Sequence, residues 1–206
     1  AMQDGVMPAD QDNLANVAVE VRRLSRLVDA MLRLSRMENG KTPLHIEKCD
    51  VVALANDLVT VHSQLFQDNG IELTFQNATG HHHLSAEIDP DLIREATVNL
   101  LSNAMRYTSE GGYVWVRVGR DRRNALITVQ DTGMGIAKED IPRVFSRFWR
   151  SDASRERAAG GLGVGLSLTK EIIDLHNGTI SVDSEEGVGT TFTLHLPLTH
   201  RKQKQR

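Results

Sequence analysis

One segment of this 206-residue chain, from Glu95 to Tyr107, separates polar from apolar side chains with the spacing of a helix. Residues three and four positions apart share one face of a helix. The polar face consists of Glu95, Asn99, Asn103, Arg106 and Tyr107. The opposite face is apolar and consists of Ile93, Ala96, Leu100 and Ala104. The pattern predicts a helix that packs on a sheet and presents a polar face to an anionic ligand, with a solvated amphipathic helix as the alternative.

Three glycine-bearing segments follow this helix at increasing distance. They are Asp131 to Ile136, Gly160 to Leu166 and Gly187 to Phe192, with Phe145 to Arg150 between the first two. A single glycine pair marks a tight turn more often than a ligand site. Three such segments behind an asparagine-bearing helix favour a phosphate-containing ligand over three unrelated turns.

Together these segments resemble the catalytic and ATP-binding domain of sensor histidine kinases, a member of the gyrase-type ATPase superfamily. The resemblance extends over about residues 13–197. The family's N, G1, F, G2 and G3 boxes resemble, in order, Asn99 to Tyr107, Asp131 to Ile136, Phe145 to Trp149, Gly161 to Leu166 and Gly187 to Thr190. We expect an α/β two-layer sandwich, in which a mixed, mostly antiparallel sheet of about five strands carries about three helices on one face and is preceded by one long helix.

Strands are expected near residues 71–76, 84–88, 113–119, 125–130, 179–184 and 191–196, with a short one near 44–47. The segments 113–119 and 125–130 carry alternating apolar residues in matching register. Asp89 and Pro90 would supply the N-cap and the first helical residue of the helix that carries Asn99.

The resemblance implies that ATP and Mg2+ bind between these boxes. A magnesium ion that bridges phosphate oxygens keeps several waters, so one side-chain carbonyl, that of Asn99, suffices as its protein ligand. Asn103 lies one turn further on and can reach the same phosphates. Arg106 brings a permanent charge where the family more often has lysine. Tyr107 offers a flat face to the adenine ring.

Asp131 is the predicted reader of the base. An ionised carboxylate can only accept hydrogen bonds, so it would take the amino proton of adenine, while a water molecule or Thr190 serves the ring nitrogen. Gly133 and Gly135 would let the backbone approach the purine. The alternative is that Asp131 merely begins a turn.

The polyphosphate is expected at the G2 box. Residues 150–161 are polar and glycine-ended and are predicted to form a lid, which leads into a helix whose free N–H groups at Gly163 and Gly165 form an anion site. Arg147 and Arg150 could reach the γ-phosphate, or could be solvated lid arginines. The absence of a Gly-Lys-Ser or Gly-Lys-Thr sequence excludes a P-loop. The predicted nucleotide-binding set is completed by Ile136, Gly161 and Leu166.

Glu95 is the predicted catalytic residue. In gyrase-type ATPases a glutamate four residues before the magnesium-binding asparagine activates the hydrolytic water. In kinases the same position would orient or deprotonate the accepting histidine.

The resemblance divides the chain into three parts. Residues 1–40 resemble the second helix of the kinase dimerisation domain, 41–200 the catalytic domain, and 201–206 form a basic tail. The first part repeats apolar residues at heptad spacing, with Leu27 and Leu34 widening a stripe formed by Leu14, Val17, Val21, Leu24, Val28 and Met31. None of the eight histidines lies in a phosphoacceptor sequence of the His-Glu-Leu-Arg-Thr-Pro type.

We therefore expect Mg-ATP binding and γ-phosphoryl transfer to a histidine of the parent protein's dimerisation domain, without autophosphorylation of this chain alone. The expected partners are that domain, a response regulator and a second copy of the chain. Two alternatives are a gyrase-type conformational machine, for which a transducer domain would be expected after Pro197, and a regulatory nucleotide-binding module without transfer chemistry.

Composition limits the remaining possibilities. The balance of 24 basic against 27 acidic residues argues against nucleic acid as a partner, and a single cysteine, Cys49, permits no internal disulfide. The sequence has no apolar run of about twenty residues. A cytoplasmic fragment of a membrane-anchored parent protein is expected from the family resemblance.

Overall fold

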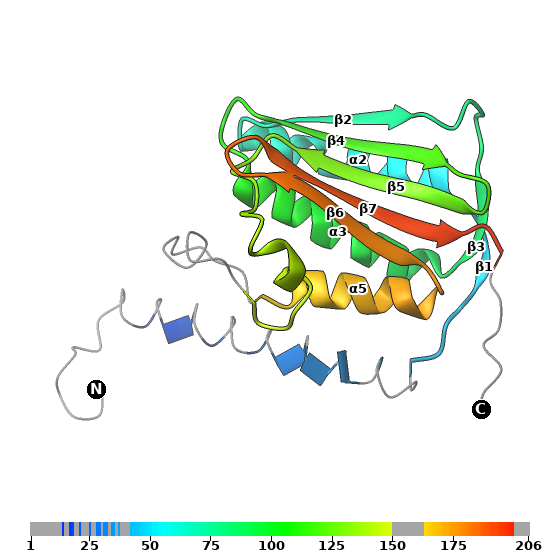
Figure 1. Cartoon of the computed structure of the whole chain (residues 1–206), viewed down its shortest axis with the longest axis horizontal. Helices are drawn as coiled ribbons and strands as arrows, with labels where there is room; N and C mark the ends of the chain where they lie inside the picture. Colours follow the sequence, from blue (N-terminus) through cyan, green and yellow to red (C-terminus); the bar gives the residue numbers. More distant parts are fainter. Residues whose placement is uncertain are drawn as a thin grey trace.

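A five-stranded sheet and three helices on one of its faces form the two layers of the fold (Figure 1). The computed structural model describes residues 42–149 and 163–199, and of the N-terminal segment residues 14, 17, 18, 21, 25, 28, 29, 31, 32, 34, 35 and 37. The strands of the sheet, in spatial order, are β2 (Glu72–Asn77), β4 (Tyr113–Arg120), β5 (Asn124–Asp131), β7 (Gly189–Pro197) and β6 (Thr179–Glu185). Within this sheet of described strands, the β2–β4 pair is parallel and the other three pairs are antiparallel. The predicted mixed, mostly antiparallel sandwich is confirmed.

The helices that cover the sheet are α2 (Val51–Asp68), α3 (Pro90–Tyr107) and α5 (Gly165–Leu175), and a short 3-10 turn, η1 (Ile141–Arg143), precedes α5. Helix α2 contacts β2 and β4, α3 contacts β5, and α5 contacts β6 and β7. Helix α3 packs against both α2 and α5. Each helix buries its apolar face, and the largest buried side chains include Leu54, Phe66, Leu100 and Ile172.

Two of these helices begin at aspartate caps. The backbone N–H of Val52 donates to Asp50 Oδ1 at 3.0 Å, and the N–H of Leu92 donates to Asp89 Oδ1 at 3.2 Å. Pro90 follows Asp89 in the first turn of α3, as the sequence predicts. Helix α5 begins after Val164, and no side chain of the described residues caps it. Within that part of the chain, the first N–H groups of α5 could therefore bind a ligand.

Strand register builds the core in rows across the sheet. Two neighbouring rows on the helix-covered face are apolar, the first being Val116, Val129, Phe192 and Val182, and the second Val118, Ile127, Leu194 and Ile180. The next row, at the end of the sheet where α3 terminates, is largely polar and consists of Val114, Asp131, Thr190 and Ser184. At this end of the sheet, polar side chains therefore take the place of core side chains.

Strands β1 (Glu47–Asp50) and β3 (Ser85–Ile88) pair with each other in a separate two-stranded sheet. The sequence predicted a short strand near residues 44–47, but the extended segment begins at Glu47 and continues to Asp50. Because Asp50 is both the last residue of β1 and the cap of α2, the chain stays extended up to the first helical turn.

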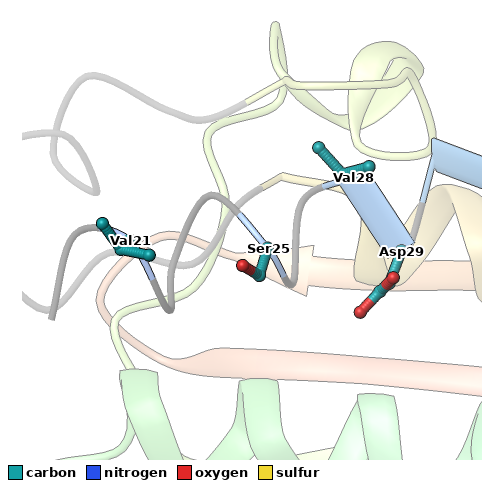
Figure 2. Close-up of a pocket in the computed structure, with 4 residues that line it drawn as sticks. All are labelled: Val21, Ser25, Val28 and Asp29. Atoms are coloured by element: carbon teal, nitrogen blue, oxygen red, sulfur yellow. The ribbon is translucent and has the colours of Figure 1, made fainter. Parts of the chain in front are cut away.

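The described residues between Leu14 and Met37 are helical. Leu14, Val17, Val21, Val28 and Met31 are each 46–55% exposed, so the predicted apolar stripe has no cover within the described part of the chain. Figure 2 shows that Val21, Ser25, Val28 and Asp29 line a pocket on this segment. Predicted stripe residues Leu24 and Leu27 lie outside the described residues.

Leu34 differs from its predicted role. The sequence placed it beside the exposed stripe, but Leu34 and Met37 are 3% and 5% exposed and belong to the hydrophobic core. The end of the segment is therefore anchored on the domain.

No helix among the described residues is long and apolar enough to span a membrane.

Candidate functional site

Helix α3 holds five of the predicted site residues on one face. Its apolar side chains, Ile93, Ala96, Leu100 and Ala104, are 0–3% exposed. On the other side Glu95, Asn99, Asn103 and Tyr107 are partly buried and Arg106 is exposed. The helical periodicity of the sequence therefore predicted the apolar and the polar face of α3 correctly. The apolar face is buried in the core, and the polar face lies outside it.

Asn99 faces the beginning of α5. A Cβ atom built at Gly165 would lie 3.9 Å from the side-chain oxygen of Asn99. The amide nitrogen of Asn99 is buried and has no hydrogen-bond partner among the described residues. A buried donor without a partner costs about 1–3 kcal/mol, which an acceptor such as a phosphate oxygen would recover.

The segment before α5 is tied to the predicted F box. The backbone N–H of Phe148 donates to the carbonyl oxygen of Gly163 at 2.9 Å. This bond holds the start of α5 next to the F box. The predicted lid at 150–161, with Arg150 and Gly161, lies outside the described residues.

Asp131 ends β5 with its carboxylate in the polar row. The backbone N–H groups of Gly133 and Thr190 both donate to Asp131 Oδ1, at 2.8 and 3.3 Å. Among the described residues no donor contacts the second oxygen, Oδ2. Burial raises the pKa of Asp131, and the two backbone hydrogen bonds oppose that shift without cancelling it. Within the described part of the chain, Asp131 therefore presents one acceptor oxygen that no donor occupies.

The loop after Asp131, which we call the G1 loop (Asp131 to Ile136), packs tightly on two neighbours. A Cβ atom at Gly133 would lie 2.6 Å from the carbonyl oxygen of Tyr107. At Gly135, which has a positive φ of 70°, it would lie 2.0 Å from the carbonyl oxygen of Glu185. Only glycine fits at these positions, so the loop joins the end of α3 to the β6–β7 turn.

Backbone hydrogen bonds hold the same three segments together. The N–H of Met134 donates to the Tyr107 carbonyl at 3.2 Å, and the N–H of Gly187 donates to the Met134 carbonyl at 2.7 Å. The predicted N, G1 and G3 boxes therefore meet at one end of the sheet. Ile136 and Leu166 pack against the core beside them.

Ser184 was not predicted as a site residue. Its hydroxyl oxygen lies 2.9 Å from the backbone nitrogen of Ile136 and 2.8 Å from Thr190 Oγ1. The available signal was its place in β6, where a polar residue follows Ile180 and Val182 on the inward-facing positions.

A family model described as histidine kinase-, DNA gyrase B-, and HSP90-like ATPase matches residues 88–200. The chain is similar to the sensor-like histidine kinase SenX3 of Mycolicibacterium smegmatis, with 35% identity over 181 residues that cover 88% of this chain and 46% of that protein. The chain spans less than half the length of the first curated relatives it matches.

Solved histidine kinases share the fold. The histidine kinase AdeS of Acinetobacter baumannii has a TM-score of 0.74 at 23% identity, covering 96% of this chain and 89% of that chain. Histidine kinase ThkA, solved in complex with response regulator protein TrrA, has a TM-score of 0.74 at 20% identity, covering 98% of this chain and 56% of that chain. These likenesses concern the fold, whereas the family model matches more than half of the sequence. The chain belongs to the family of histidine kinase-, DNA gyrase B- and HSP90-like ATPases.

Proposed function

We propose that this chain binds Mg-ATP and donates the γ-phosphoryl group to a histidine of a dimerisation domain in two-component signalling. The observation that carries the proposal is the carboxylate of Asp131, which is buried, oriented by two backbone N–H groups and left with one acceptor oxygen. That oxygen would accept a proton of the adenine amino group. Guanine has a carbonyl oxygen in that place and would be repelled.

The phosphates would lie between α3 and α5. The buried amide nitrogen of Asn99 and the uncapped start of α5 both supply donors there. Asn103 and Arg106 follow on the same face of α3. Tyr107 would lie against the base.

The donor set also suits a magnesium ion. Asn99 offers one neutral carbonyl oxygen, which is sufficient for an ion that keeps several waters. When bound, the ion neutralises charge on the phosphate oxygens. The protein residues would orient the triphosphate and hold the accepting histidine.

Glu95 would act on the acceptor, because it lies one turn before Asn99 on the same face. In the transfer, the bond from the γ-phosphorus to the bridging oxygen breaks, ADP leaves, and a bond to an imidazole nitrogen forms. Glu95 would orient the imidazole or take its proton.

The domain arrangement belongs to the same proposal. Residues 1–40 would supply the second dimerisation helix and 41–200 the catalytic domain, and the acceptor histidine would come from the first dimerisation helix of the parent protein. A second copy of the chain and a response regulator are the proposed partners, the latter supported by the complex of ThkA with TrrA. A cytoplasmic location and a membrane-anchored parent protein follow from the family resemblance alone.

Calorimetry with ATP and GTP tests the base-reading role. ATP should bind, and GTP should bind at least about tenfold more weakly, a difference of roughly one hydrogen bond. Asp131→Asn places a donor against the adenine amino group and should weaken ATP binding about thirtyfold, or about 2 kcal/mol. Asp183→Asn, on the exposed face of β6, is the matched control and should leave the affinity unchanged. Equal binding of ATP by the Asp131 variant would remove Asp131 from the base site.

A further inference from the structure

The polar row continues beyond Asp131 to the edge strand. Asp131 on β5 is paired with Thr190 on β7, and Thr190 is paired with Ser184 on β6. Ser184 is partly buried, and it is the member of the row furthest from Asp131. Its hydroxyl nevertheless contacts groups on both of the segments that surround Asp131.

Three contacts fix the direction of the Ser184 proton. The hydroxyl oxygen lies 2.9 Å from the backbone nitrogen of Ile136, 2.9 Å from the carbonyl oxygen of Gly189 and 2.8 Å from Thr190 Oγ1. A serine hydroxyl has one proton and two lone pairs. The Gly189 carbonyl can only accept, so it takes the proton. The Ile136 N–H can only donate, so it takes one lone pair.

The remaining lone pair of Ser184 determines the role of Thr190. Because Ser184 has no second proton, the hydroxyl of Thr190 must donate to Ser184. Thr190 Oγ1 then has only lone pairs to offer to a ligand. The backbone N–H of Thr190 donates to Asp131 Oδ1 at the same time.

We propose that Ser184 is a positioning residue for base recognition, which acts by holding the Thr190 hydroxyl as an acceptor and by fastening the G1 loop at Ile136. The proposal rests on the adenine nucleotide function argued above. The sequence left open whether Thr190 or a water molecule serves the ring nitrogen of adenine. Because the Thr190 hydroxyl already donates its proton to Ser184, it cannot donate to the ring nitrogen. The ring nitrogen would instead accept from a donor held on Thr190, such as a water molecule.

Ser184→Ala tests the contribution to affinity. The variant removes the Ser184 contacts to the Ile136 N–H and the Gly189 carbonyl, and it leaves the Thr190 hydroxyl without the acceptor that orients it. Affinity for ADP should fall about tenfold, the factor that one hydrogen bond of typical net strength represents. Ser184→Thr keeps a hydroxyl in a β-branched residue suited to a strand and should retain most of the affinity.

Ser181→Ala is the matched control. Ser181 lies on the same strand but on the opposite, exposed face, where its hydroxyl lies 3.1 Å from His195 Nε2. It loses a side-chain hydrogen bond of the same kind without touching the polar row. Its ADP affinity should equal that of the unmodified chain.

The ligand 1-deaza-ADP separates positioning from a general structural role, because it lacks the ring nitrogen in question. The unmodified chain should prefer ADP over 1-deaza-ADP, and Ser184→Ala should largely abolish that preference. A merely structural role would weaken both ligands equally and keep their ratio.

A double-mutant cycle gives a second measurement. If Ser184 acts through Thr190, then Thr190→Val should also lose the preference for ADP over 1-deaza-ADP. The double variant Thr190→Val with Ser184→Ala should show the same preference as Thr190→Val alone. Unchanged ADP affinity in Ser184→Ala, or an unchanged ratio of the two ligands, would overturn the inference. Failure of the unmodified chain to bind ADP would instead overturn the proposed function, and the inference with it.

Discussion

The ring nitrogen Nε2 of His176, just after α5, accepts a hydrogen bond of 2.9 Å from the backbone N–H of Asp89, the cap residue of α3. The other ring nitrogen, Nδ1, lies 2.7 Å from the carbonyl oxygen of Ile172 and donates to it. His176 is 1% exposed. One neutral side chain thus joins the end of α5 to the start of α3, the two helices that bear the candidate phosphate-binding groups.

His176→Phe should destabilise the fold. The phenyl ring keeps the apolar volume but leaves the Asp89 N–H without an acceptor in the core, at a cost of about 1–3 kcal/mol. Urea unfolding measures the loss. His195→Phe, on the partly exposed face of β7, is the control and should change stability by less than about 0.5 kcal/mol. Equal stability of the two variants would show that the His176–Asp89 contact is not needed.

Nucleotide affinity should depend on pH through Asp131. Burial raises the pKa of Asp131 above its value in the unfolded chain, despite the hydrogen bonds from Gly133 and Thr190. Only the ionised form accepts the adenine amino proton, so affinity should fall as Asp131 becomes protonated on acidification. This fall should occur at a pH above about 3.9, the pKa of an ordinary aspartate. Calorimetry with ADP across a pH series measures this step, and Asp131→Asn should lack it.

The stability effect of the same residue has the opposite sign. Because the folded chain binds this proton more tightly than the unfolded chain, ionisation of Asp131 costs stability near neutral pH, and the cost disappears as pH falls through the raised pKa. Asp131→Asn should therefore unfold at no lower urea concentration than the unmodified chain at neutral pH. If nucleotide affinity instead stayed constant on acidification down to about pH 3.9, where an ordinary aspartate is half protonated, the raised pKa of Asp131 would be contradicted.

The two faces of α3 could be predicted from the sequence because the pattern that indicates them involves only residues close together in the chain. The stripes around Asn99 and the cap at Asp89 depend on residues three or four positions apart, and both are as expected. The strands near residues 113–119 and 125–130 followed from alternation for the same reason. The overall sandwich was implied by the family resemblance.

Contacts between distant segments could not be predicted in this way. His176 is 87 residues from Asp89, and Ser184 is 48 residues from Ile136, so neither pair leaves a periodic signal. A serine near the end of a strand looks like a solvated hydroxyl until β7 and the G1 loop are placed beside it. Leu34 was misassigned because heptad spacing does not tell which end of a stripe packs on its own domain.

Asn99→Ala should weaken binding of Mg-ATP far more than binding of ADP without magnesium. The side-chain oxygen is the proposed ligand of the ion, so the loss of that contact matters only when the ion is present, whereas the loss of the amide donor to a phosphate affects binding under both conditions. Calorimetry with and without magnesium gives the two values. Equal losses under both conditions would assign Asn99 to the phosphates or to the fold instead.

The chain should self-associate through the stripe that includes Val21 and Val28. These side chains are about half exposed, and burying several of them at about 25 cal/mol per Å² of apolar surface favours a second copy of the helix. Val21→Glu combined with Val28→Glu should give monomers that still bind ADP. Val61→Glu with Leu65→Glu, on the exposed side of α2, is the control and should not change association.

Light scattering at about 100 μM measures that association, since any dimer of about −5.5 kcal/mol or stronger is well populated there. A monomeric unmodified chain would show that the stripe is covered in another way.

Phosphoryl transfer to a separate acceptor is the most direct test of the central claim. The chain is mixed with Mg-ATP labelled at the γ-phosphate and with a dimerisation domain that carries the acceptor histidine. The account predicts an acid-labile label on that domain, which is absent when the acceptor histidine is replaced by glutamine and strongly reduced with Asp131→Asn. Tight ATP binding without any labelling of the acceptor would contradict it and would leave a nucleotide-binding module without transfer chemistry.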